Sequence, residues 1–359
     1  MRQGQFIAAL VAVFALFTAP QRASAQDNPC QSEHPPMKIV VDSVHHDVVI
    51  TVGPCTLPPM PMDMSEMEMG GGGEYSGKVD IRTRFLWPVS GYLRGWELTM
   101  LDSLGHALPQ ATMHHMELVN FDRRQLVYTM AERVLGIGEE TQGTRIPKSV
   151  GMPLTKGSHM GLYIMWNNTT STDMKGVSLQ LRMPWAHINL TPRPVQVLPF
   201  KVDVNMHPGK GDAFDFPEGA GSKAKEFTVP IGGRLIAIGG HLHDYGKELR
   251  IEDVATGRVI ARVRANRRPD GSVTSVTHRL FGVLGRGPRL VPGRKYRLVA
   301  VYENPAGKPI MAAMGLIGGV IAPDNIKNWP KVNYTDPDYV TDLGGWPTPD
   351  KWKLPPLKP

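Results

Sequence analysis

Two histidines separated by a single residue, His241 and His243, stand in the segment GGHLHDYGKEL, directly after an apolar run. In a β-strand, residues i and i+2 point to the same face, so both imidazoles can bind one metal ion with little backbone adjustment. Imidazole nitrogen suits copper and zinc ions. A pair of this kind also occurs as two ordinary surface histidines. The segment is therefore a candidate metal site that needs support from other residues.

A second pair, the adjacent His114 and His115, lies far upstream in ATMHHMELVNFD. Adjacent residues of a strand face opposite ways, so joint ligation requires a bulge, a strand end or a kink in the backbone. The pair His45-His46 shows that adjacent histidines also occur in this chain without such a context. Further along, Met311 and Met314 stand in KPIMAAMGLIGG. A thioether there ordinarily fills a core, but it suits Cu(I) where it faces histidines.

The order of these motifs (His-His, then His-x-His, then methionine) resembles that of the copper type II, ascorbate-dependent monooxygenases. The family includes the peptidylglycine α-hydroxylating and dopamine β-hydroxylating enzymes. The chain also resembles exported bacterial proteins with the same GGHLHD and MG motifs. The matching stretches, within roughly residues 78–325, are His114-His115-Met116, HLHDYGK from His241, and Ala313-Met314-Gly315.

The resemblance implies two jelly-roll-like β-sandwiches side by side, each presenting one copper ion. His241, His243 and Met314 would form the second site, where dioxygen is activated to hydroxylate a C–H bond of an unknown small molecule or peptide. His114 and His115 would belong to the first site, which passes electrons from an ascorbate-like or quinol donor to the second. We therefore expect two copper ions and monooxygenase-type chemistry.

The first site departs from the family pattern, which supplies a third histidine from a later strand. The corresponding segment, residues 162–168, contains no histidine. Met165 is the expected third ligand, because side chains on one face of neighbouring strands can share an ion. His159 is another candidate, and the first site can also be a remnant in which Met165 belongs to the core.

This gap keeps a second class of function open, a non-catalytic copper protein that stores, buffers or delivers the ion. A methionine cluster alternating with acidic residues supports it, since thioethers bind Cu(I) without competition from protons. The cluster can equally be a low-complexity linker. A third possibility is a β-sandwich module that binds another protein. The cluster comprises Met60, Met62, Met64, Met67 and Met69.

The elements that must position these residues are β-strands. Glycine and proline number 38 and 32 of 359 residues, and helices cannot carry so many breakers. Short apolar runs recur at intervals of roughly 8–12 residues between turn signals, as in β-sandwiches. Two of the predicted strands are HMGLYIMW (159–166) and RLIAIGGHLH (234–243). The segment TPRPVQVLP (191–199) separates two blocks of such runs. The sequence predicts an all-β protein with two consecutive jelly-roll-like antiparallel sandwiches.

The predicted organisation has five parts. Residues 1–25 are a signal peptide and 26–77 a leader with two short strands and a Met/Gly-rich linker. Residues 78–193 and 194–325 are the two copper-type sandwiches. Residues 326–359 form an extended, Pro/Trp-rich tail packed on the surface.

The N-terminal segment predicts export to the periplasm or the cell exterior. Arg2, the apolar run at residues 6–17 and Ala23-Ser24-Ala25 match a cleavable signal, although a retained anchor is the alternative. No later stretch reaches 18 apolar residues, so we expect no stable membrane insertion. In an oxidising compartment Cys30 and Cys55 are expected to form a disulfide rather than bind metal as thiols.

Charge argues against a nucleic-acid partner. The net charge of +7 falls to +5 once residues 1–25, which carry two arginines and no acid, are removed. This mild excess is spread along the chain without long basic blocks, unlike a nucleic-acid-binding surface.

Overall fold

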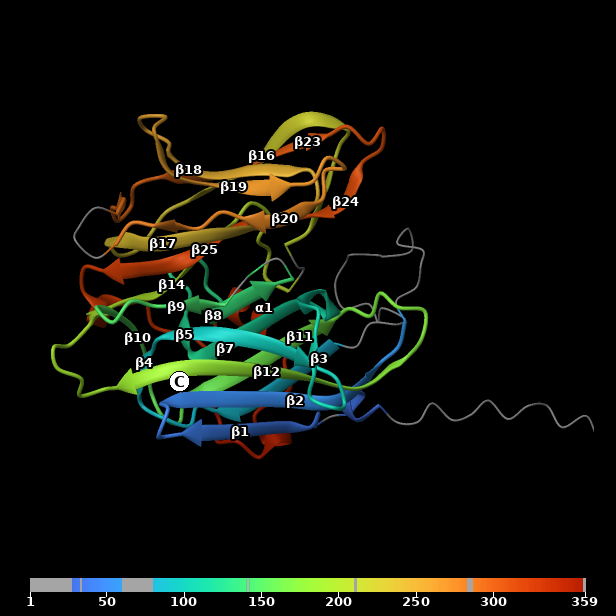
Figure 1. Ribbon diagram of the computed structural model, residues 1–359. Helices are drawn as coiled ribbons and strands as arrows, with labels where there is room; N and C mark the ends of the chain where they lie inside the picture. The colour runs from blue at the N-terminus through green and yellow to red at the C-terminus, as the bar shows by residue number, and fades with distance from the viewer. Residues whose placement is uncertain are drawn as a thin grey trace, which may run out of the picture.

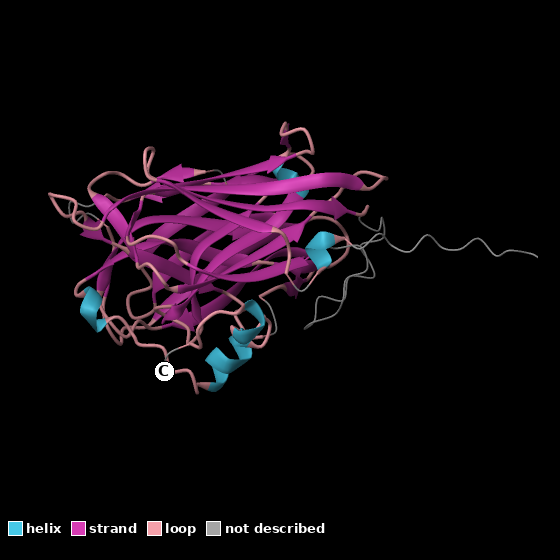
Figure 2. Cartoon of the chain, turned by 90° about the horizontal axis from the view of Figure 1, so that it is seen from below, coloured by secondary structure: helices cyan, strands magenta, loops and turns pink. Residues whose placement is uncertain are grey.

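The computed structural model describes residues 28–32, 34–59, 80–139, 141, 143–209, 212–282 and 287–357. The predicted signal segment and methionine cluster lie outside this part of the chain. Of the described residues, 54% lie in strands and 6% in helices, which confirms the predicted all-β class (Figure 2). No helix within the described ranges is long and apolar enough to cross a bilayer.

The first sandwich consists of two sheets. The larger has the path β1-β2-β12-β4-β10-β13, with β5, β6 and β9 attached to it. Its strands are β1 (Met37–Asp42), β2 (Asp47–Leu57), β4 (Gly91–Leu93), β5 (Gly95–Leu101), β6 (Ala107–Leu108), β9 (Thr144–Arg145), β10 (Val150–Leu154), β12 (Met174–His187) and β13 (Val195–Gln196). The smaller sheet, in the order β3-β11-β7-β8, contains β3 (Asp80–Leu86), β7 (Met113–Arg124), β8 (Ala131–Gly138) and β11 (His159–Trp166).

The second sandwich is built in the same way, and the main sheets of both lie one above another in Figure 1. Its inner sheet has the path β14-β25-β17-β21, with β22 on β17, and contains β14 (Leu198–Asp203), β17 (Gly233–Leu242), β21 (Arg279–Leu280), β22 (Arg289–Leu290) and β25 (Gly315–Pro323). Its outer sheet, in the order β16-β23-β18-β19-β20, contains β16 (Gly219–Phe227), β18 (Gly246–Asp253), β19 (Val259–Arg267), β20 (Val273–Val276) and β23 (Tyr296–Asn304). A further pair is β15 (Phe214–Phe216) with β24 (Ile310–Ala313).

In the described residues, helical structure is limited to a few short pieces. They are α1 (Pro337–Leu343) and the 3₁₀ turns η1 (Pro29–Gln31), η3 (Gln110–Thr112), η4 (Ile326–Asn328) and η5 (Asp350–Trp352). The side chain of Asp336 caps α1 by accepting hydrogen bonds from two backbone N–H groups.

Each sandwich has its own hydrophobic core, as period-2 alternation along its strands requires. Most buried apolar residues up to Val197 pack in the first core, joined by Ile236, and most from Leu198 onward pack in the second, joined by Leu126. A third, small cluster comprises Val119, Phe121, Ala131 and Tyr339. Each fully buried Val, Leu, Ile, Phe or Met side chain in these cores contributes roughly 1.5–3 kcal/mol of transfer free energy. The two cores therefore stabilise the two sandwiches largely separately.

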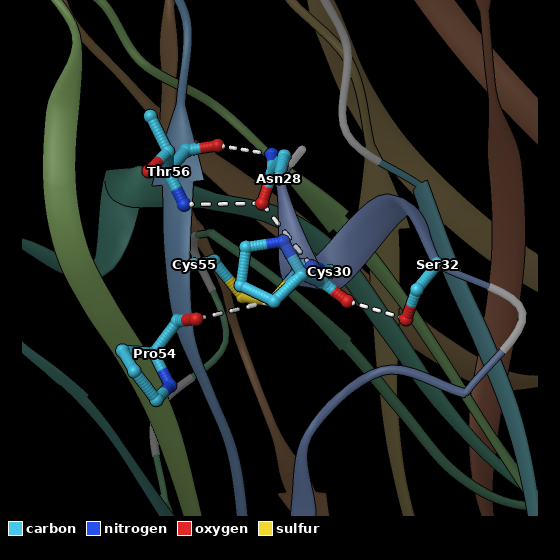
Figure 3. The surroundings of a disulfide bond; sticks show 7 residues. Asn28, Cys30, Ser32, Pro54, Cys55 and Thr56 are labelled. Carbon is cyan, nitrogen blue, oxygen red and sulfur yellow. Dashed lines mark hydrogen bonds between the residues drawn. A yellow bond between two sulfur atoms is a disulfide. The ribbon is translucent and has the colours of Figure 1, made fainter. Parts of the chain in front are cut away.

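The N-terminal segment is part of the first sandwich rather than a separate leader. Its two predicted strands are β1 and β2, and β2 pairs with β12 along most of its length. The predicted disulfide between Cys30 and Cys55 is confirmed, and it ties η1 to β2 (Figure 3). The bond encloses a loop with a sequence separation of 25 residues.

The C-terminal segment is anchored more deeply than the predicted extended tail. The Tyr339 side chain is fully buried, and its hydroxyl donates a hydrogen bond of 2.5 Å to the carbonyl of Phe121 on β7. Arg133 on β8 donates two hydrogen bonds of 2.7 Å to the carboxylate of Asp342. The tail thus covers one end of the outer face of the β3-β11-β7-β8 sheet.

Candidate metal centre

A register shift in β7 brings the adjacent histidines to one side. Met165 of β11 pairs with His115, whereas Trp166 pairs with Met113, so His114 is the extra residue between them. The centroids of the two imidazole rings are 4.1 Å apart. This is the irregularity that joint ligation by His114 and His115 requires.

The His-x-His motif lies at the end of β17, in the sheet facing β7. His241 pairs with Leu316 of β25, and His243 follows the last strand residue. The turn closes at once, since the N–H of Gly246 donates a hydrogen bond of 3.0 Å to the carbonyl of His243. The ring centroids of His241 and His243 are 4.9 Å apart.

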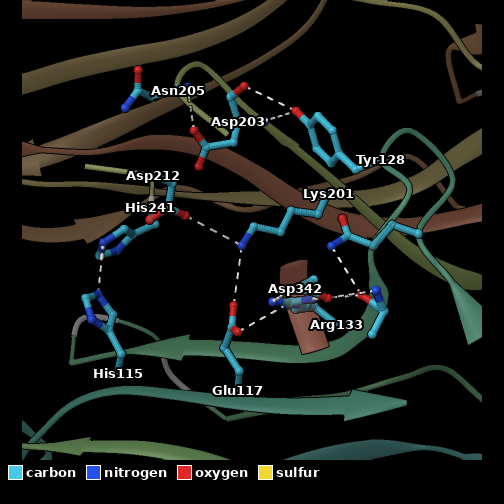
Figure 4. Close-up of polar contacts among 12 residues, drawn as sticks. His115, Glu117, Tyr128, Arg133, Lys201, Asp203, Asn205, Asp212, His241 and Asp342 are labelled. Carbon is cyan, nitrogen blue, oxygen red and sulfur yellow. Dashed lines mark hydrogen bonds and ion pairs between the residues drawn. The ribbon is translucent and has the colours of Figure 1, made fainter. Parts of the chain in front are cut away.

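The two motifs meet between the sandwiches. The Nε2 atoms of His115 and His241 are 3.3 Å apart, although 126 residues separate them in sequence (Figure 4). Ring nitrogens of His114, His115 and His243 lie within 4.8 Å of one another. Two nitrogen ligands of a tetrahedral ion, each about 2.0–2.1 Å from the metal, are separated by about 3.3 Å. The distance between His115 and His241 therefore fits two ligands of one ion.

The protonation of the site also fits metal binding. Burial lowers the pKa of His115 well below its ordinary value, and the neighbouring His114, His241 and His243 lower it further. Metal binding needs neutral imidazole, so a depressed pKa keeps the ligand ready at neutral pH.

Both predicted sulfur ligands lie opposite one of the histidines in the strand register. Met165 is directly opposite His115 on β11 and therefore shares its face of the sheet. Met314 immediately precedes β25, and the pairing of Leu242 with Gly315 places it opposite His243 when continued by one residue. Met314 is 8% exposed, whereas the neighbouring Met311 is 63% exposed. Of these two methionines, Met314 is the buried one and lies opposite His243 in the strand register.

The sequence predicted two separate centres, and the structure instead gathers His114, His115, His241 and His243 into one group. His159 takes no part in it. It begins β11 at the end away from Met165, and its Nδ1 lies 3.1 Å from a carboxylate oxygen of Asp122. Its Nε2 lies 2.8 Å from the carbonyl oxygen of Pro355.

An ion-pair network that we did not predict from the sequence lies beside the histidines. Glu117 follows His115 by two residues, and its carboxylate lies 3.4 Å from Nζ of Lys201 on β14 and 3.3 Å from Nε of Arg133 (Figure 4). Burial raises the pKa of Glu117, but the charges of Lys201 and Arg133 outweigh it and hold the pKa below the ordinary value. The one sequence signal for Glu117 is its spacing of two residues from His115, which places both side chains on the same face of a strand.

A second cross-domain contact lies next to this network. The hydroxyl of Tyr128, in the β7–β8 connection, accepts a hydrogen bond of 2.9 Å from the backbone N–H of Asp203 on β14. Burial, with the adjacent charge of Asp212, raises the pKa of Asp203 to about 8. This shift favours the neutral carboxyl, which reduces the cost of burying it.

Comparisons with known proteins give no family. No family model matches the sequence, and no curated protein matches it either. The chain is similar in structure to the STIV MCP, with 9% identity and a TM-score of 0.38 over 71% of this chain and 94% of that one. For PNGF-II the values are 12% and 0.33 over 76% and 66%. For the fucolectin of striped bass (Morone saxatilis) serum they are 10% and 0.18 over 82% and 98%. At TM-scores below 0.5, none of these likenesses supports a function.

Proposed function

We propose that this protein is an exported copper-dependent oxidoreductase of the monooxygenase type, with its metal centre between the two sandwiches. One observation carries the proposal, the 3.3 Å approach of His115 Nε2 to His241 Nε2 from opposite sheets. Ordinary surface histidines from two distant sequence motifs would not be expected to lie within 3.3 Å of each other. The oxidising compartment that export implies agrees with the Cys30–Cys55 disulfide.

The donor set favours copper over zinc. His114, His115, His241 and His243 offer imidazole nitrogens, which bind both Cu(I) and Cu(II), and the flanking methionine Met314 adds a thioether that suits Cu(I). When bound, copper supplies one-electron redox chemistry with dioxygen. The strands hold the imidazoles at fixed spacing, and burial holds the pKa of His115 well below its ordinary value. The remaining partners of the proposed reaction are an ascorbate-like or quinol donor and a small molecule or peptide with a reactive C–H bond.

Oxygen consumption by the copper-loaded protein with ascorbate tests this function. The wild type should consume oxygen catalytically, and His243→Ala should abolish it. His106→Ala is the matched control, because His106 is exposed and pairs with Asp102 away from the centre. Equal oxygen consumption by wild type and His243→Ala would refute the assignment.

One observation favours the second candidate, a non-catalytic protein that stores or delivers copper. The electron transfer that the family resemblance implies runs between two separate copper sites, whereas here all four imidazoles gather in one group. The same assay separates the candidates. Tight copper binding without oxygen consumption, across ascorbate and quinol donors, would identify a storage or delivery protein.

A further inference from the structure

Glu117 and Lys201 bridge the two sandwiches next to the histidine centre. Glu117 lies on β7, two residues beyond His115, so both side chains point toward the second sandwich. Lys201 lies on β14 of that sandwich, and its Nζ is 3.4 Å from the Glu117 carboxylate. The ion pair and the His115–His241 contact therefore cross the same interface from the same face of β7.

The same neighbourhood holds on the other side of the interface. Across the inner sheet of the second sandwich, Asp203 of β14 pairs with Leu316 of β25, which pairs with His241 of β17. Lys201 lies two residues before Asp203 on β14, so both side chains lie on the same face of the sheet. Lys201 pairs with Gly318 of β25, which pairs with Gly239 of β17. In both sheets, the residue that forms the ion pair is thus displaced by two residues along the strand direction from the position of the histidine.

The ion pair is shielded and held from both sides. The side chains of Lys201 and Glu117 are 13% and 24% exposed, well below those of ordinary surface ion pairs. Arg133 also binds Glu117, and Asp342 fixes Arg133 in turn. Lys201 lies 3.7 Å from Asp212 within its own sandwich. Removing one member would therefore leave partly buried charges unpaired.

We infer that Lys201 and Glu117 are positioning residues that set the spacing of the two sandwiches so that His115 and His241 reach one metal ion. The inference rests on the proposed metal centre for its functional meaning. Because each sandwich has its own core, loss of the pair should shift the sandwiches without unfolding them. The Tyr128–Asp203 hydrogen bond remains as a second tether.

Cobalt(II) binding to Lys201→Met tests the inference, because tetrahedral cobalt absorbs visible light far more strongly than octahedral cobalt. The variant should bind cobalt roughly 10–100-fold more weakly, the range for loss of a residue that supports metal ligands. Its tetrahedral absorption should fall as well. Lys225→Met is the matched control. The ammonium group of Lys225 donates a hydrogen bond to the Met206 carbonyl, and both residues belong to the second sandwich. Wild-type affinity and spectrum in Lys201→Met would overturn the inference.

Two further measurements separate this inference from the proposed function. If the residues act as a pair, Glu117→Gln should weaken binding similarly, and the double variant should lose no more than either single one. Additive losses would contradict a pair. In metal-free protein, hydrogen exchange in β7 and β17 should speed up in Lys201→Met but not in Lys225→Met. Failure of the wild type to bind metal would refute the proposed function, while unchanged exchange would refute the positioning role.

Discussion

His115 and His241 face each other across two sandwiches with their Nε2 atoms 3.3 Å apart. The first residue lies beside a register shift in β7, and the second lies near the end of β17. This separation matches that of two nitrogen ligands on one tetrahedral ion. The centre therefore belongs to the interface rather than to either sandwich.

Substitution of one histidine should disable the whole centre. His241→Ala should lower copper affinity more than the roughly 10–100-fold expected for losing a residue outside the ligand set. His115→Ala should do the same, because both nitrogens serve one ion. Copper titration against a competing chelator measures both. If His241→Ala instead retained one tightly bound copper on His114 and His115, two independent sites would be present.

Stability of the metal-free protein should depend on pH through His115. Its pKa is held well below the ordinary 6.5 by burial and then by its histidine neighbours. The unfolded chain consequently takes up a proton at a higher pH than the folded chain. The free energy of unfolding should fall as the pH drops below about 6.5. Urea unfolding between pH 8 and pH 5 measures the slope, which should be shallower in His115→Gln. An identical slope in that variant would be evidence against the depressed pKa.

The tail should be part of the cooperative fold. Tyr339→Ala removes a fully buried ring and its hydrogen bond to Phe121, which should cost about 3–5 kcal/mol of unfolding free energy. Val340, the next residue, is 50% exposed, so Val340→Ala should cost far less. Chemical unfolding of both variants makes the comparison. Equal, small losses would mean that the tail is not bound as described.

The disulfide should stabilise the fold without touching the metal centre. Replacing Cys30 and Cys55 by alanine opens a loop with a sequence separation of 25 residues and should lower stability by about 3 kcal/mol. Copper affinity should stay within twofold, since β2 lies in the sheet opposite β7. Loss of copper binding in the double variant would instead assign the sulfurs to a metal site.

Local periodicity was enough to predict much of the fold. The run HMGLYIMW is β11 without change of bounds, and the run around His241 is β17 to within a residue at each end. The adjacency of His114 and His115 also predicted that their strand must be irregular if both bind one ion. The sequence pattern was less informative where segments distant in the chain pack together. Tyr339, for example, is buried against β7, more than two hundred residues away in the sequence.

The convergence of the two motifs could not be predicted from spacing, because no local pattern records which face of one sandwich meets which face of another. The family resemblance placed His114 and His115 in a centre separate from that of His241 and His243. Lys201 stood unnoticed for the same reason, as its partner Glu117 is on the other sandwich. Interdomain contacts of this kind depend on packing, which the sequence encodes only globally.

Anomalous X-ray scattering at the copper edge, from crystals of the copper-loaded protein, tests the central claim most directly. We expect one anomalous peak between the sandwiches, about 2.0–2.1 Å from Nε2 of both His115 and His241. Data above and below the edge would distinguish copper from adventitious zinc. Two separate peaks, one bound only by His114 and His115 and the other only by His241 and His243, would contradict a shared centre.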